Sequence, residues 1–96
     1  MNKIISYLGF AKKSNNCVTG QTALRKSKKH FNLIIVCSSA SENLNNLAKN
    51  LANKNNCEHI VLNDLEMLLH AKDIKIAGIT DENLSKAIVK EANLKE

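Results

Sequence analysis

The five residues Leu33–Cys37 form an uninterrupted apolar run in which three residues are β-branched. Such a run is typical of a strand that is buried on both faces, whereas a strand with one face in water alternates apolar and polar residues. A doubly buried strand needs helices above and below the sheet that contains it. The run therefore predicts a layered α/β fold.

Three further segments are expected to join the same sheet. Residues 59–62 and 74–79 are mainly apolar and rich in Ile and Val, and residues 17–19 form a shorter extended piece. Together with Leu33–Cys37 they predict a sheet of about four strands. Gly78, late in the last strand, is expected to allow close packing or a bend.

Two helices are expected before the central strand. The spacing of Ile4, Leu8 and Ala11 predicts a first helix that ends near residues 14–16. A second helix is expected to open at Gly20 and to run to about residue 29, with a weak apolar face. The segment between residues 17 and 33 therefore reads as strand, glycine and helix.

Three more helices are expected after the central strand. Ser41 is a candidate N-cap for the third, whose apolar residues follow the i, i+3, i+4, i+7 pattern until residues 55–56 end it. Asn63 and Glu66 resemble a capping box for a short helix over residues 65–69. Thr80 is expected to cap a final helix that has two acidic residues in its first turn.

Helices and strands thus alternate almost without exception. This pattern predicts an α/β fold, a three-layer α-β-α sandwich with a central mixed sheet of about four strands. A chain of 96 residues is long enough for one core and too short for two, so residues 1–96 are expected to form a single domain.

The fixed positive charge in the first half of the chain is unopposed, because the first carboxylate is Glu42. A concentrated cationic field favours a polyanionic partner, and nucleic acid is the commonest. The alternative is a solvated, lysine-rich surface with no partner. The cations that precede Glu42 are Lys3, Lys12, Lys13, Arg25, Lys26, Lys28 and Lys29.

The composition of the chain argues against several other classes of protein. Aromatic residues make up 3% of the chain. That is too few to form the row of aromatic side chains on which proteins that bind single strands stack the bases. Cys17, Cys37 and Cys57 lie far apart without metal-ligand spacing, and Cys37 reads as a small buried hydrophobe, so no metal, cofactor or disulfide is expected. No apolar stretch reaches the ~20 residues of a membrane span. The expected protein is soluble and cytoplasmic.

The segment from Thr19 to residue 29 is the candidate binding site. Gly20 at a helix start lets foreign backbone approach closely, and the free N–H groups of the first turn attract anions. Gln21 and Thr22 could donate hydrogen bonds to a phosphate or to a base edge. The four cations Arg25, Lys26, Lys28 and Lys29 are expected to extend the positive surface, with His30 beside them. The alternative is an ordinary turn from strand to helix.

Several segments carry a resemblance to a known family. They are residues 8–13, 18–20, 33–36, 40–43 and 77–88, which follow in order along nearly the whole length of the chain. The chain resembles the kink-turn-binding ribosomal proteins of the L-seven-Ae and L-thirty-e type, and above all their small bacterial YlxQ-like branch. The resemblance implies an α-β-α sandwich and binding to RNA sharply bent at a bulge beside sheared G·A pairs, in association with the ribosome and as a monomer.

The resemblance also implies roles for residues. Gly20 and Lys26 match the family's glycine and its guanine- or phosphate-binding lysine, while Thr22 and Ala23 stand where the family often has Asn and Glu. Ala23 cannot hydrogen-bond, and the segment from Gly20 to the central strand is about two residues shorter than the family norm. The loop of residues 70–74, with Ala71 and Lys72, would cover a flipped-out base.

Two other functions remain as alternatives. One is a protein–protein interaction module that kept the fold and lost kink-turn specificity, which Ala23 favours. The other is an enzyme with Cys17 as nucleophile and His30 or His59 as base, but no spacing assembles such a site. His59 is expected to be a packing residue. The sequence therefore favours a protein that is not an enzyme.

Overall fold

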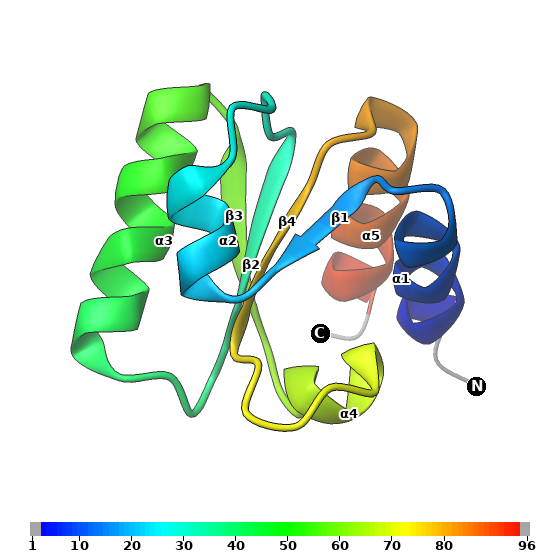
Figure 1. Cartoon of the computed structure of the whole chain (residues 1–96). Coiled ribbons are helices and arrows are strands. Elements are labelled where there is room, and N and C mark those ends of the chain that lie inside the picture. The colour runs from blue at the N-terminus through cyan, green and yellow to red at the C-terminus, as the bar shows by residue number, and fades with distance from the viewer. Residues whose placement is uncertain (1–2, 95–96) are drawn as a thin grey trace.

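The computed structural model describes residues 3–94, which form five helices and four strands (Figure 1). In chain order these elements are α1 (Lys3–Lys13), β1 (Cys17–Thr19), α2 (Gln21–Lys26), β2 (Leu33–Cys37), α3 (Glu42–Asn55), β3 (Glu58–Leu62), α4 (Leu65–Leu69), β4 (Ile76–Ile79) and α5 (Glu82–Leu94). The predicted alternation of helices and strands is confirmed.

The four strands form one sheet in the order β1-β4-β2-β3. β3 runs parallel to β2, and β4 is antiparallel to both of its neighbours, β1 and β2. At the centre of the sheet Ile35 lies opposite Ile60 on one side and Ala77 on the other. The sheet is therefore mixed, as the sequence predicts.

The side chains of β2 alternate between two hydrophobic cores. Leu33, Ile35 and Cys37 pack with α1, α4 and α5, whereas Ile34 and Val36 pack with α2 and α3. All five residues are buried, which confirms a strand covered on both faces. Figure 1 shows α2 and α3 on one side of the sheet and α1 and α5 on the other. The fold is the expected three-layer sandwich.

Gly78 lets the α2 layer approach the sheet closely. A Cβ atom on Gly78 would lie 2.7 Å from Cδ1 of Phe31 and 2.9 Å from Cδ2 of Leu24, which is closer than real Cβ atoms come. Both neighbours are buried, with 2% and 1% of their surface exposed. The expectation of close packing at Gly78 is confirmed, and this contact fixes the height of α2 above β4.

The second helix is shorter than the sequence predicts. It ends at Lys26, and Ser27 already has extended backbone. The chain leaves the helix because Phe31 has to reach the core, where its N–H donates to Oδ1 of Asn55 at 3.0 Å. The N–H of Lys29 donates to Oγ of Ser27 at 3.1 Å, which shapes the turn. The prediction of helix as far as Lys29 is wrong for this reason.

The third helix agrees with its predicted ends. The Oγ atom of Ser41 accepts a hydrogen bond from the N–H of Leu44 at 3.2 Å, so Ser41 is the N-cap. At the other end Asn56 adopts a left-handed conformation with φ 54°, and its N–H binds carbonyls of the last turn. A left-handed residue is a common way to end a helix.

The predicted capping box of α4 is wrong. Asp64, not Asn63, precedes the helix, and it is left-handed and makes no side-chain cap. The carboxylate of Glu66 instead accepts a hydrogen bond from the N–H of Asp73 at 2.6 Å. This bond shapes the loop before β4. The strand β4 begins at Ile76 and not at residue 74 as predicted.

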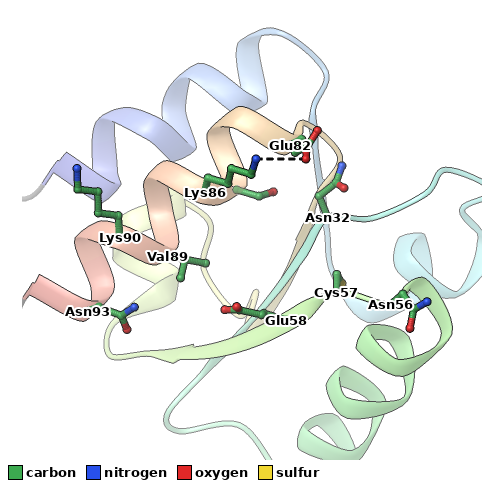
Figure 2. Close-up of a pocket in the computed structure, with 10 residues that line it drawn as sticks. Asn32, Asn56, Cys57, Glu58, Glu82, Lys86, Val89, Lys90 and Asn93 are labelled. Atoms are coloured by element: carbon green, nitrogen blue, oxygen red, sulfur yellow. Dashed lines mark ion pairs between the residues drawn. The ribbon is translucent and has the colours of Figure 1, made fainter.

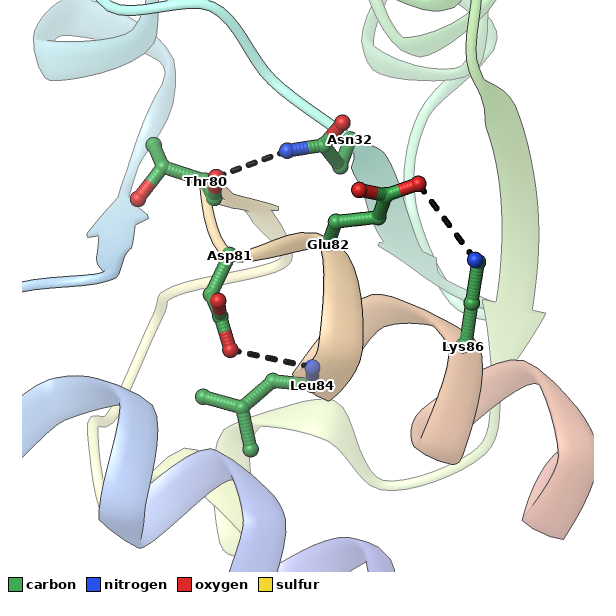
Figure 3. A network of polar contacts seen from close by, with 6 residues as sticks. All are labelled: Asn32, Thr80, Asp81, Glu82, Leu84 and Lys86. Atoms are coloured by element: carbon green, nitrogen blue, oxygen red, sulfur yellow. Dashed lines mark hydrogen bonds and ion pairs between the residues drawn. The ribbon is translucent and has the colours of Figure 1, made fainter.

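The cap of α5 is also shifted by one residue. Asp81 accepts a hydrogen bond from the N–H of Leu84 at 3.1 Å, so Asp81 and not Thr80 is the N-cap (Figure 3). Thr80 joins neighbouring segments: its Oγ1 donates to Oδ1 of Asn16 at 3.1 Å, and its carbonyl accepts from Nδ2 of Asn32 at 2.7 Å. These bonds lie where the segments before β1 and β2 pass the start of α5.

The Gly78 contact generates a prediction about stability. Gly78→Ala should destabilise the fold by about 1–3 kcal/mol, because the new methyl group overpacks the space that Phe31 and Leu24 fill. Gly9→Ala is the matched control, since no atom lies within 4 Å of a Cβ at that position in α1. It should stabilise the protein by up to about 1 kcal/mol through helix propensity. Urea denaturation measures both, and an unchanged midpoint for Gly78→Ala would contradict the argument.

Candidate nucleic-acid interface

The N-terminal tip of α2 depends on a backbone conformation that favours glycine. Gly20 has φ 87° and ψ 147°, a region that residues with a side chain rarely adopt. A Cβ there would have room, because its nearest neighbour, Cδ1 of Ile74, would be 3.5 Å away. The N–H of Gly20 donates to the carbonyl of Ile76 at 3.0 Å, which ties the tip to the start of β4.

The tip is open on its outer side. Gln21, Thr22 and Ala23 are all exposed, and no side chain caps the helix within residues 3–94. The exposed residues Gln21 and Thr22 therefore lie together at the uncapped start of α2. Thr19, at the end of β1, is half-buried and lies opposite Ala77 in the sheet.

The loop between α4 and β4 lies beside this tip. The side chain of Ile74 lies next to Gly20. The loop is held in place by hydrogen bonds that the N–H groups of Ala71 and Asp73 donate to Glu66. Lys72 is exposed and Ala71 is half-buried. The structure thus brings the segment from Thr19 to Thr22 next to the loop of residues 70–75, although some fifty residues separate them in the sequence.

The four candidate cations lie toward the other end of α2. Arg25 and Lys26 occupy its last turn, and Lys28 and Lys29 follow in the irregular segment before β2. A helix of six residues is only ~9 Å long, so the tip and these cations remain close. All four side chains are exposed, and Nζ of Lys29 donates to the carbonyl of Asn15 at 3.3 Å.

The cations of α1 lie on the opposite face of the sheet. Lys12 donates from Nζ to the carbonyl of Leu69 at 2.7 Å, at the C-terminal end of α4, and Lys3 lies 4.0 Å from Glu91. The positive charge of the first 41 residues therefore does not form one surface. That expectation is wrong, because the chain crosses from one layer to the other between α1 and α2.

In the structure the net positive charge lies mainly in one of the two helical layers. Residues 20–57 contain α2, β2 and α3, and they include six Lys or Arg residues and one acidic residue, Glu42, for a net charge of +5. The net charge of the whole chain is also +5. The remaining segments are balanced, so the α2–α3 layer carries the excess.

A pocket of about 420 Å³ lies within this charged layer. It is bordered by Arg25, Lys28, Lys29 and His30 from the α2 side and by Lys54 from α3. The sequence does not indicate Lys54 as a candidate binding residue, because it belongs to the half of the chain in which lysines and carboxylates are mixed. Only the packing of α3 beside α2 places it with the earlier cations.

The larger pocket of about 670 Å³ has a different character (Figure 2). It lies between α5 and the start of β3, and its charges are mixed: Lys86 and Lys90 on α5, and Glu58 and Glu82. Lys86 and Glu82 form an ion pair of 3.3 Å. This pocket therefore shows no preference for an anion, and it contains none of the candidate RNA-binding residues.

Cys17, the candidate nucleophile, and Cys57 are both poorly suited to nucleophilic attack. Burial, opposed by the charge of Lys12, raises the pKa of Cys17 to about 11, and burial together with Glu58 raises the pKa of Cys57. Both thiols therefore stay protonated near neutral pH. His59 is exposed on the edge strand and is not a packing residue as predicted, because its side chain points away from the core that takes Ile60.

Within residues 3–94 no three His, Cys, Asp or Glu side chains converge as metal ligands would. None of the helices in this range combines the length and the apolar character that crossing a bilayer requires.

Comparisons with known proteins identify the fold and leave the family open. No family model matches the sequence, and no curated protein matches it. A solved structure of a protein of unknown function from Bacillus halodurans is similar, with a TM-score of 0.79 and 17% sequence identity. The match covers 97% of this chain and 99% of that one. At this identity the similarity shows a shared α-β-α fold.

The raised pKa of Cys17 generates a prediction about pH dependence. The folded pKa of about 11 lies above the ordinary value of 9.0, so the stabilisation is complete below pH 9 and is lost as the pH rises through 11. By pH 11 wild-type protein should lose about 2 kcal/mol more unfolding free energy than Cys17→Ala does. Urea denaturation at pH 8 and pH 11 measures this difference, and parallel losses in the two proteins would contradict it.

Proposed function

We propose that the protein binds structured RNA through the α2–α3 layer. The observation that carries this proposal is the net charge of +5 on residues 20–57, with one carboxylate in the whole segment. An RNA backbone offers regularly spaced phosphates, and neutralising them releases counterions, which is the main source of sequence-independent affinity. The exposed side chains of Arg25, Lys26, Lys28 and Lys29 are the first contacts of this kind.

The α2 tip supplies a second type of contact. Phosphate contacts fix a nucleic acid in place, whereas specificity comes from contacts to bases. Gln21 and Thr22 are exposed donors at a glycine-led tip, and Ala71 and Lys72 lie in the adjacent loop. This combination supports binding to a bent or bulged RNA that presents base edges, and the resemblance makes a kink-turn the proposed target. In this proposal the protein acts as a monomer in the cytoplasm, associated with the ribosome and without catalysis.

A protein–protein interaction module is the second candidate function. Ala23 favours it, because this exposed residue at the tip has no hydrogen-bonding side chain where a base-reading group would stand. In that case the same layer would bind an acidic protein surface. The two candidates differ in their response to RNA shape.

The charge argument predicts a steep salt dependence. The affinity for a bulged RNA duplex should fall linearly on a plot of log K against log salt, and Lys26→Ala should reduce the slope by about one unit. Lys13→Ala is the matched control, because Lys13 is an exposed lysine on α1, on the far side of the sheet. Fluorescence anisotropy across a salt series measures both slopes. Equal slopes for the two variants, or a titration that ignores salt, would contradict the proposal.

The tip predicts a dependence on RNA shape. Wild-type protein should shift a kink-turn RNA at lower concentration than a twin whose G·A pairs are disrupted. Thr22→Asn combined with Ala23→Glu, which restores the pair implied by the resemblance, should widen this difference severalfold. Gel shifts with both RNAs measure it. Equal binding of the wild-type protein to the two RNAs would mean that it has only general affinity for RNA. No binding to either RNA would favour the protein-interaction module.

A further inference from the structure

The pocket between α2 and α3 concentrates positive charge in a concave site. Arg25, Lys28, Lys29, His30 and Lys54 border it, and no Asp or Glu is among the residues that line it. Its lining also includes Leu24, Phe31 and Leu51, which belong to the core between the sheet and these helices. A concave, cationic surface beside such a low-dielectric core focuses the field and raises the local concentration of anions.

The walls of this pocket are held together by hydrogen bonds. Asn55, on the last turn of α3, accepts the N–H of Phe31 at 3.0 Å and donates from Nδ2 to the carbonyl of Leu51 at 2.8 Å. These bonds fix the segment that carries Lys28 and Lys29 to the helix that carries Lys54. The fold therefore holds the segment that carries Lys28 and Lys29 beside the end of α3 that carries Lys54.

The convergence is not compensated within the protein. Both ion pairs of residues 3–94, Lys3 with Glu91 and Lys86 with Glu82, lie outside the pocket. Among these cations only Lys29 has a polar contact in the described structure, with the carbonyl of Asn15. Like charges placed close together repel one another, so an anion that enters the pocket relieves this repulsion.

We propose that this pocket is a second phosphate-binding site, separate from the α2 tip, and that it holds a backbone phosphate of the RNA. The inference rests on the proposed RNA binding and adds Lys54 to the interface. The ~9 Å length of α2 is short enough for one RNA strand to contact both the tip and the pocket. Lys54 is the residue that distinguishes the pocket from the α2 cations, because it lies on another helix.

Two lysines of α3 provide a matched test. Lys54 borders the pocket and Lys49 does not, although both are exposed and both lie on the same helix. Five residues place them roughly 140° apart around the helix axis. Lys54→Ala should weaken binding to a bulged RNA duplex several-fold at low salt and reduce the salt slope by about one unit. Lys49→Ala removes the same charge from the same layer but not from the pocket, so it should weaken binding and flatten the salt slope clearly less than Lys54→Ala does. Lys54→Arg should retain binding.

The outcomes separate this inference from the proposed function. If wild type binds the RNA and the two alanine variants behave alike, the pocket assignment is overturned and RNA binding stands. If wild type binds no RNA, both fail. Thermal denaturation of each variant shows whether a loss reflects unfolding, and Lys54→Arg gives an independent readout because it keeps the charge.

A second arm distinguishes RNA backbone from a free polyphosphate ligand. Tripolyphosphate is titrated into labelled protein, with the amide NMR signals of residues 25–31 and 54–55 as the readout. Weak binding at these residues, displaced by the RNA duplex, supports a site for backbone phosphate. Tripolyphosphate that binds more tightly than the RNA at the same salt concentration would overturn the assignment to RNA.

Discussion

The contact between Phe31 and Gly78 sets the geometry on which the candidate binding surface depends. The ring of Phe31 lies directly against β4, because its Cδ1 would be only 2.7 Å from a Cβ on Gly78. To reach this position the chain has to leave α2 at Lys26, and the N–H of Phe31 is then bound by Asn55 of α3. A packing constraint in the core thereby places the segment that carries Lys28 and Lys29 beside α3, where both residues border the cationic pocket.

Much of the fold could be predicted from the sequence because its signals are local. The apolar run of β2, the spacing of α3 and the cap at Ser41 each depend on residues a few positions apart. The end of α2 could not be predicted, because it depends on Gly78, about fifty residues away in the sequence. The same holds for Glu66, whose carboxylate binds the loop before β4 and not its own helix.

The layout of the candidate site could not be predicted from the sequence. Charge counting identifies a cationic first half, but a sum along the chain cannot tell which side of a sheet each charge occupies. Lys12 binds the carbonyl of Leu69 at the C-terminal end of α4, where a cation interacts favourably with the helix dipole, and α1 as a whole lies in the other layer. Lys54 could be added only after packing placed α3 beside α2.

The separation of charge and hydrogen-bonding groups along α2 has a consequence for recognition. The glycine-led tip presents the polar side chains of Gln21 and Thr22, whereas the four cations lie in the last turn of this six-residue helix and just beyond it. Base contacts specify and phosphate contacts position, so in an RNA complex the two ends would have different tasks. A change at the tip would then alter the choice among RNAs at nearly constant salt dependence. A change at the pocket would alter the salt dependence and leave the choice of RNA intact.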